Sequence, residues 1–507
     1  MSIAAALSIA TNSLANINRQ LGLVSHNVAN AATSGYVRER GTQTALAAEG
    51  VGLGVRSGPV LRDVDFLLRA ELTAQQANTN GAMARQRALQ GIDALHGVPG
   101  DGSDLPSLLG TMQTAFSALA GDPANAAGQR QVSRAADNLA RGINALGAAY
   151  LAERQAAQDA LSADVTALNT GLANIGDLTT RITALRAAGM GSADLENERD
   201  AAVAGIAGLV ELKAVEQGNG GMLLLTSSGM TLPTDGTAPF SMAPATVGAS
   251  AFHPGGGVPG VMRNGIDVTA QLRGGRIGAN LTLRDRTLPV FQAELDEFAQ
   301  SLAARFDAQG LRLFSDPTGA LPSGGGVPVQ AGYVGFAVNI QVDAAVVADA
   351  TLLRDGTHVV AGSPTGASAF TPNPVGGPAG FTGLIHRILD FAFGAKAQAG
   401  VAQAAVHAAG LGPDGTLTAP FAVQTTLGAM ARDVVATQAT EAAAAADQVV
   451  LETSVRDRLA ARYADVTGVD IDAEMALMLQ LQNAYGANAR VISASQSMWD
   501  QLLNAVR

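Results

Sequence analysis

Both ends of this 507-residue chain carry the spacing of long amphipathic helices, and this pair of patterns constrains the fold more than any other feature. Near the N-terminus, apolar or small residues recur in alternating steps of four and three. The row consists of Ile3, Leu7, Ala10, Leu14, Ile17, Leu21, Val24 and Val28. Heptad spacing of this kind predicts a helix with one continuous apolar stripe, about 40 Å long if it is helical throughout.

The C-terminal segment predicts a second helix of the same kind. Its main apolar row is spaced seven residues apart and consists of Ile471, Met478, Tyr485, Ile492 and Trp499. A companion row, which ends at Leu503, is half polar. Asp470, Asp472 and Glu474 stand where the helix should begin, since acidic side chains stabilise the first turn. Each stripe has three possible partners: the domain that carries the helix, the other terminal helix, or copies of the chain in an assembly.

The composition favours helices that pack along their length. The chain is 47% hydrophobic but only 4% aromatic. Helical patterns cover 65–96, 104–175, 177–212 and 288–306, with a break at Gly121-Asp122-Pro123, and the alanine-rich segment 396–464 is also predicted to be helical. Segments 215–271 and 313–395 are rich in glycine or proline, and the second alternates at Val338, Ile340 and Val342. We therefore expect a mainly α fold with β-rich insertions in the middle.

The chain lacks the residue patterns of common catalytic and metal sites. It has no cysteine, and its six histidines lie far apart, so we expect no catalytic residue, no cofactor and no metal ion. His26 could serve as a ligand, but a single histidine in a turn is more often solvated. The acids of 465–474 lack the ligand order of a calcium loop and are better explained as helix-start residues.

Charge and hydropathy narrow the possible partners. The formal net charge of −11 disfavours a nucleic-acid backbone as a partner. The first residues lack the basic region and the long apolar core of a secretory signal peptide. The chain contains no apolar run of about 18 residues or more, so we expect no membrane span.

The end of the N-terminal helix carries a signature. The stretch SHNVANAATSGYVRER, residues 25–40, resembles the signature of the flagellar rod, hook and hook-associated axial proteins, in which a terminal heptad helix precedes an Asn-rich turn and a Gly-Tyr pair. The matching residues are Ser25, Asn27, Val28, Ala29, Asn30, Ala31, Thr33, Gly35 and Tyr36. A physical reason stands beside the resemblance, since Asn and Gly favour the turn and left-handed conformations that end a helix.

Four further segments resemble the FlgK family of hook-associated proteins. They are an Asp-Pro block in 119–146, an Arg-Asp segment at Leu195, Arg199 and Asp200, a Gly-Gly and Leu-Pro block in 274–289, and the C-terminal helix in 468–503. The segments follow one another in the family's order and span almost the full length of the chain.

The resemblance implies a structural protein of the bacterial flagellum that forms the ring at the hook–filament junction. It implies export in an unfolded state by the flagellar type III apparatus, so the protein would be cytoplasmic transiently and then secreted. The terminal helices would pair as a coiled coil. The implied parts are an assembly domain (1–60 with 465–507), a helical middle domain (61–214 with 272–312 and 396–464), a β-rich insertion (215–271) and an outer insertion (313–395).

The resemblance also implies partners and no enzymatic activity. The expected partners are copies of the chain in a ring, the hook protein below, a second hook-associated junction protein above, and a cytoplasmic export chaperone at the C-terminal helix. The expected assembly residues are Ile3, Leu7, Leu14, Ile17, Leu21, Val24, Asn27, Val28, Asn30, Gly35, Tyr36, Ile471, Met478, Tyr485, Ile492, Trp499 and Leu503.

Other classes of protein stay open. A hook or rod protein shares the N-terminal signature but is not expected to carry the Arg-Asp and Leu-Pro blocks. A generic coiled-coil scaffold or adhesin explains the heptads but not the signature. An enzyme fused to axial termini would need a zinc or carboxylate site in 215–395, where His253 and His358 are the only histidines before position 380.

Overall fold

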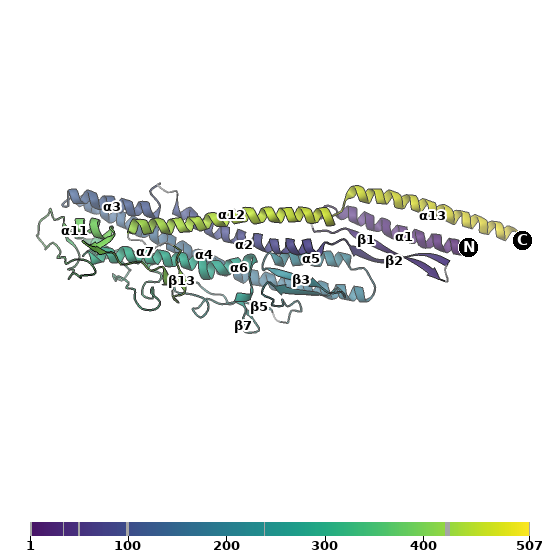
Figure 1. Cartoon of the computed structure of the whole chain (residues 1–507), viewed down its shortest axis with the longest axis horizontal. Helices are drawn as coiled ribbons and strands as arrows, with labels where there is room; N and C mark the ends of the chain where they lie inside the picture. Colours follow the sequence, from purple (N-terminus) through teal and green to yellow (C-terminus); the bar gives the residue numbers. More distant parts are fainter. Residues whose placement is uncertain are drawn as a thin grey trace.

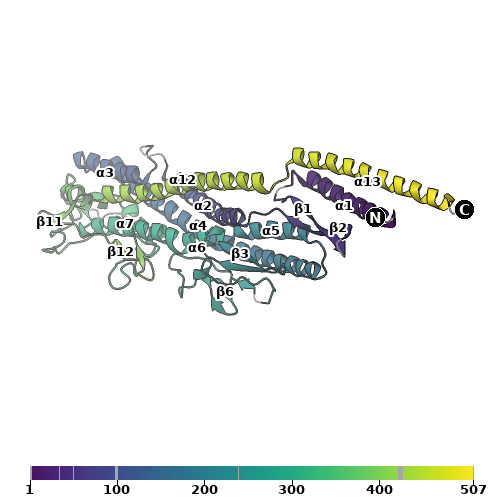
Figure 2. The ribbon, with the colours of Figure 1, turned by 45° about the vertical axis from the view of Figure 1, so that its right-hand side comes forward.

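The computed structural model describes residues 3–33, 35–48, 51–97, 101–237, 239–420 and 426–505. It shows an elongated, mainly helical molecule whose two termini lie at the same end (Figure 1). A slender terminal part extends from a longer helical body, as two views of the ribbon show (Figures 1 and 2). The expected fold class, mainly α with small β insertions, is confirmed.

The terminal part consists of two helices and a hairpin. The helices are α1 (Ile3–Asn30) and α13 (Ile471–Ala505), and the antiparallel hairpin is formed by β1 (Glu39–Ala48) and β2 (Val51–Arg62). The helices lie side by side in opposite directions, and the hairpin packs on α1 (Figure 1). The predicted pairing of the terminal helices is thus confirmed, whereas the hairpin was not predicted because 39–62 holds few large apolar residues.

The buried apolar residues of α1 follow the predicted heptad row. Ala10, Ile17 and Val24 lie seven residues apart and are buried. Ile17 and Val24 form a small cluster with Leu481 of α13. The partly buried side chains around this cluster are Leu21, Leu477, Met478 and Ala484. The apolar stripe of α1 therefore packs on residues 477–484 of α13.

Five long helices build the body. They are α2 (Phe66–His96), α3 (Leu105–Gly121), α4 (Ala126–Ala187), α7 (Leu288–Ala308) and α12 (Leu427–Thr467). Asp65, Asp104 and Asn125 start α2, α3 and α4, because each side chain accepts hydrogen bonds from first-turn N–H groups. The predicted break after Gly121 is confirmed. The helix predicted over 177–212 is instead the end of α4 followed by α5 (Ala193–Ala207).

Two hydrophobic clusters fill the body. The larger cluster joins α2, α3, the first half of α4, α7 and α12 with buried side chains of 313–395, among them Phe314, Phe336 and Leu384. The smaller cluster joins the second half of α4 with α5 and residues 209–281. Both glycine-rich segments thus contribute to these cores, and the domain boundaries expected from the sequence stay predictions.

The strands of the body form small antiparallel sheets. They are β3 (Leu212–Glu216) with β4 (Met222–Thr226), β5 (Phe240–Ser241) with β6 (Met262–Arg263) and β7 (Ile266–Asp267), β8 (Phe314–Ser315) with β9 (Gln341–Val342), β10 (Lys396–Gln398) with β11 (Val401–Ala402), and β12 (Ala409–Leu411) with β13 (Leu417–Thr418). The short helices are α6 (Gly275–Thr282), α8 (Phe336–Asn339), α9 (Ala344–Ala348), α10 (Leu352–Asp355) and α11 (Gly383–Arg387), with single turns at Thr269–Gln271, Leu283–Thr287 and Ile388–Ala392.

One local prediction is wrong, and a second holds in part. The helix predicted from 396 begins at Leu427, and two hairpins occupy 396–418, since Gly400, Gly410 and Gly412 adopt the positive φ angles of turns. The alternation expected over 338–342 holds in burial, since Ile340 and Val342 are buried and residues 339 and 341 are exposed. Only Gln341–Val342 form a strand, because residue 338 lies in α8.

Candidate assembly interface

Asn27 ties the N-terminal helix to the hairpin. The side chain is buried, and its Nδ2 donates to the backbone oxygen of Glu39 at 2.9 Å, while Oδ1 accepts from the Glu39 backbone N–H at 3.1 Å. The Tyr36 hydroxyl also donates to Oδ1, at 2.9 Å. Asn27 lies inside α1 and fixes the first residue of β1. Its role therefore differs from the helix-ending turn that the sequence predicted.

The turn after α1 uses the remaining signature residues. Asn30 donates to the backbone oxygen of His26 at 3.0 Å, and Gly35 has φ +79°, a conformation that favours glycine. The Tyr36 hydroxyl lies 3.1 Å from Nδ1 of His26. Burial, with the nearby carboxylates, raises the pKa of Tyr36, so its hydroxyl stays a hydrogen-bond donor at neutral pH.

The signature is also joined to the C-terminal helices. The backbone N–H of Arg38 donates to the backbone oxygen of Thr467, at the end of α12, at 2.9 Å. The Arg38 guanidinium binds Glu474, in the first turn of α13, with Nε and Oε1 2.7 Å apart. Glu474 is buried, so this pair fixes the point where the chain passes from the body into α13. Asp470 accepts from the N–H groups of residues 472 and 473, which confirms the predicted helix start.

Ion pairs connect the terminal part to the body. Arg62, at the end of β2, binds Glu196 at 3.0 Å and Asp200 at 2.7 Å, both in α5. Arg69 of α2 bridges Asp200, at 2.5 Å, and Glu216 of β3, at 2.9 Å. Arg62 is almost fully buried, so these charges are shielded from water and depend on one another.

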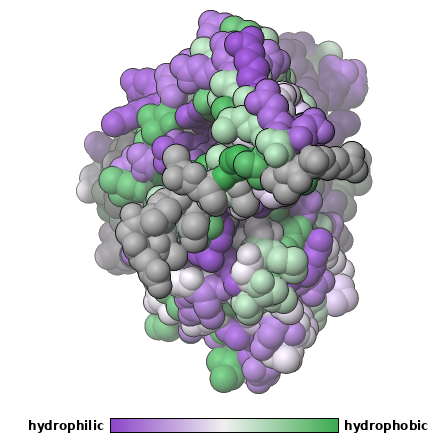
Figure 3. All heavy atoms as spheres, turned by 90° about the vertical axis from the view of Figure 1, so that its right-hand side faces the viewer, coloured by the Kyte–Doolittle hydropathy of each residue, from purple (hydrophilic) through white to green (hydrophobic). Residues whose placement is uncertain are grey.

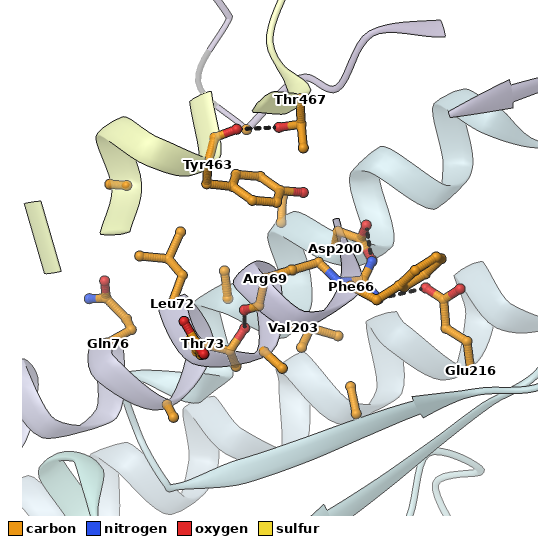
Figure 4. Close-up of a pocket in the computed structure, with 18 of the residues that line it drawn as sticks. Phe66, Arg69, Leu72, Thr73, Gln76, Asp200, Val203, Glu216, Tyr463 and Thr467 are labelled. Atoms are coloured by element: carbon orange, nitrogen blue, oxygen red, sulfur yellow. Dashed lines mark hydrogen bonds and ion pairs between the residues drawn. The ribbon is translucent and has the colours of Figure 1, made fainter. Parts of the chain in front are cut away.

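A cavity of about 1530 Å³ lies where the terminal part meets the body. Figure 4 shows Arg69 between Asp200 and Glu216 on one side of it, and Tyr463 and Thr467 of α12 on the other. The lining is part charged and part apolar. The joint is therefore held mainly by directed polar contacts and less by close apolar packing.

The structure divides the predicted assembly residues into inward and outward sets. In α1, Ile17 and Val24 are buried, and Ile3, Leu7, Leu14, Leu21 and Val28 are half-buried. In α13, Met478 packs on the cluster and Ile492 is half-buried, but Ile471, Tyr485, Trp499 and Leu503 are exposed. The buried positions of α13 are instead Glu474, Leu481 and Ser495. The apolar row predicted for α13 thus lies mostly beside the contact with α1.

Exposed apolar side chains follow α13 along its length. They include Leu479, 59% exposed, and Trp499, 49% exposed, and continue through Met475, Val491, Met498 and Leu502. Viewed from the end that carries the termini, hydrophobic side chains lie between hydrophilic ones (Figure 3). A helix pair with apolar residues on its outer surface has the character of an interaction site. No helix among the described residues is long and apolar enough to cross a membrane.

Three potential metal ligands meet beside the signature. His26, Glu39 and Asp194 each offer one ligand atom, and these atoms lie within 4.8 Å of one another. Burial and the adjacent Asp194 carboxylate raise the pKa of Glu39 to about 7. From the sequence, His26 is expected to be solvated, because nothing in the sequence indicates that position 194 lies beside it.

Comparisons with known proteins match both the body and the terminal part. A family model described as "Flagellar hook-associated protein FlgK helical domain" matches residues 89–319, and one described as "Flagellar basal body rod FlgEFG protein C-terminal" matches residues 462–505. Curated relatives named "Flagellar hook-associated protein 1", from Salmonella typhimurium and Salmonella typhi, are each 23% identical over 303 residues. The helical body of this chain is therefore similar to the FlgK family.

The FlgK-family relationship covers part of each protein. The alignment includes 57% of this chain and 53% of the Salmonella proteins, so the chain spans about half the length of the curated relatives it matches. The solved structure of the flagellar hook junction protein FlgK from Burkholderia pseudomallei is 25% identical, with a TM-score of 0.41, over 50% of this chain and 45% of that chain. The rod-type model covers α13 and its exposed apolar side chains.

Proposed function

We propose that this chain is a structural subunit of the bacterial flagellum that assembles at the hook–filament junction. Its terminal helix pair would contact copies of itself in a ring, and the body would lie outside. The observation that carries this proposal is the line of exposed apolar side chains on α13, which includes Ile471, Tyr485, Trp499 and Leu503. The helix pair leaves these residues uncovered, although they keep the heptad spacing of a contact surface.

Burial of these side chains supplies enough free energy for assembly. A large apolar side chain contributes roughly 1.5–3 kcal/mol when it moves from water into a contact. Several such residues per subunit would offset the cost of association, which is about 4–15 kcal/mol. Assembly would therefore be sensitive to single changes in this row, including the half-buried Ile492.

Export and further partners complete the proposal. The chain would leave the cell unfolded through the flagellar type III apparatus, with a cytoplasmic chaperone covering the apolar side of α13 beforehand. In the assembled structure, the hook protein would lie below it and a second hook-associated junction protein above. The exposed apolar residues of α13 support a chaperone contact, since they are the ones that need protection before assembly.

A hook or rod protein is the second candidate. The match of residues 462–505 to a rod-type model favours it, because that segment forms the exposed helix of the terminal part. The match of residues 89–319 to the FlgK helical domain favours the junction.

A gene deletion separates these two candidates. Electron microscopy of the cells and an assay for flagellin in the medium should show hooks without filaments and flagellin lost to the medium. Missing hooks would move the protein to the hook or rod. Normal filaments would contradict both flagellar roles.

A pair of matched variants tests the surface itself. Leu479→Asp places a charge on the exposed side of α13, and Met190→Asp places one on an equally exposed apolar residue of the body. We expect Leu479→Asp to abolish motility when it replaces the native chain, and Met190→Asp to leave motility intact. Equal motility of the two strains would contradict assembly through α13.

A further inference from the structure

The joint between the terminal part and the body holds three polar side chains from three elements. His26 belongs to α1, Glu39 begins β1 and Asp194 lies in the first turn of α5. Nδ1 of His26 is 3.9 Å from Oε2 of Glu39, and Nε2 is 3.8 Å from Oδ1 of Asp194. These separations exceed those of direct hydrogen bonds, and one ligand atom of each residue lies within 4.8 Å of the other two.

Glu39 is buried without enough partners. The residue is 5% exposed, and its Oε1 atom has no hydrogen-bond partner. A buried carboxylate is costly unless a positive charge or a hydrogen bond compensates it. The neighbouring Asp194 adds a second negative charge, so a cation bound here would lower the electrostatic energy of the two carboxylates.

The signature residues determine which ring nitrogen of His26 faces Asp194. The Glu39 N–H and the Tyr36 hydroxyl both donate to Oδ1 of Asn27. Because the Tyr36 hydrogen is used in this way, its oxygen accepts from Nδ1–H of His26, 3.1 Å away. In the neutral imidazole, Nε2 then carries the lone pair and faces the Asp194 carboxylate. Two acceptors that face each other repel unless a cation lies between them.

We propose that His26, Glu39 and Asp194 bind a divalent transition-metal ion of the Zn²⁺ type, which fastens α1 and β1 to α5. The site is independent of how the chain assembles.

The donor set selects the class of ion. One imidazole nitrogen with two carboxylate oxygens suits Zn²⁺ and its neighbours, whereas Ca²⁺ and Mg²⁺ prefer oxygen ligands alone. Ligands of tetrahedral zinc at about 2.0–2.1 Å lie about 3.3 Å apart, so the three groups need to close slightly. Asp194 is 72% exposed and can move toward the ion. The Tyr36 and Asn27 contacts behind His26 are the outer-shell support that metal-binding histidines usually have.

The binding test uses the full chain, free of any purification tag, and titration calorimetry with ZnCl₂. We expect one ion per chain with micromolar affinity and no response to CaCl₂. Asp194→Asn and His26→Gln should each weaken binding at least tenfold. The matched control is His253→Gln, which removes another histidine beside a carboxylate, Asp267, at 3.5 Å. This variant should bind zinc like the native chain.

Asp194→Asn keeps the test informative, because an exposed helix residue can be changed without unfolding the protein. Absence of zinc binding by the native chain would overturn the proposal. Equal binding by native chain and Asp194→Asn would overturn it as well.

Hydrogen exchange distinguishes an ion bound at this site from one bound elsewhere on the surface. Zinc should slow exchange at least tenfold in residues 36–40 and 193–196 of the native chain, and should not do so in Asp194→Asn. Unchanged exchange in the native chain at saturating zinc would contradict the fastening role.

Discussion

Phe306 in the body and Trp499 in the terminal part show two ways of placing a large aromatic ring. Phe306 has no exposed surface and lies between Phe116, Phe314 and Phe393, with centroid distances of 5.9, 5.9 and 5.3 Å. Trp499 leaves 49% of its surface exposed. The body therefore buries a core of aromatic rings within one chain, whereas α13 carries apolar residues that one chain does not cover.

The largest effect is expected from a change in the body. Phe306→Ala should lower the free energy of unfolding by about 3–5 kcal/mol, because it removes a fully buried ring and leaves a cavity. Urea unfolding followed by circular dichroism measures this loss. A loss below about 1 kcal/mol would mean that the body packs as loosely as the terminal pair.

Buried charge makes the body sensitive to pH. Glu294 of α7 is buried beside Gln438 and Tyr150, and burial raises its pKa to about 7. A carboxyl whose pKa is raised in the folded state binds its proton more tightly there than in the unfolded chain. Its contribution to the free energy of unfolding is therefore complete below pH 4.5 and is lost as the pH rises through about 7. The body should thus be less stable at pH 8 than at pH 5, by up to about 3 kcal/mol from this group.

Glu294→Gln isolates that contribution. The variant should be more stable than the native chain at pH 8, and its stability should fall less between pH 5 and pH 8. Asp296, whose pKa is also raised to about 7 by burial, stays in both proteins and accounts for the remaining slope. Parallel pH profiles for the two chains would contradict this reading of Glu294.

Asn27→Ala should uncouple the hairpin from α1. It leaves the N–H and C=O of Glu39 and the Tyr36 hydroxyl without their present partner, at a cost of about 2–3 kcal/mol. The loss should appear as faster hydrogen exchange in residues 36–40, with the body unchanged. Val28→Ala, at the next position of the helix, is the matched control.

Leu481→Ala should lower the free energy of unfolding of the terminal helix pair by about 2 kcal/mol. This value is at the low end for a core leucine, because the cluster around Leu481 is small. Trp499 is the single tryptophan of the chain, so its fluorescence reports on α13 alone. The fluorescence transition should move to lower urea while the circular dichroism transition of the body stays. Coincident shifts would show that terminal part and body unfold as one unit.

The smallest effect is expected from Leu479→Asp. This side chain is exposed, so the free energy of unfolding of the monomer should change by less than about 0.5 kcal/mol. The Trp499 reporter remains in place for the measurement. A large destabilisation would mean that α13 already buries this face within one chain.

The sequence predicted the elements whose signal is local. The heptad rows of α1 and α13 lie in single segments, and the caps of α2, α3 and α4 stand directly before them. The orientation of α13 was not predictable in the same way. Apolar spacing marks faces that tend to become buried, but it does not say which face the partner in the same chain takes. Here Leu481 took that position, on the side of the Met478 row that faces away from the companion row.

Contacts between distant segments were beyond the sequence. His26 and Asp194 lie 168 positions apart in the printed sequence, and only the packing of the terminal part on α5 brings them together. The alanine-rich stretch after 396 misled the helix prediction, because alanine favours a helix only where glycine and proline do not interrupt it. The role of Asn27 was hidden for a third reason, since a helix-interior asparagine with long-range contacts has no distinct local pattern.

The bond between Arg38 and Glu474 joins residues 436 positions apart and has a consequence for the order of folding. Closing a loop of that length in an unordered chain is entropically costly and brings few contacts at first. Once α2 and α12 have packed along each other, however, the ends of these helices already hold the segments on either side close together. The pairing of α1 with α13 then becomes a nearly local event. The terminal pair should consequently be the last part to fold. Although α1 is synthesised before the body, it can pack on α13 only after the body has folded.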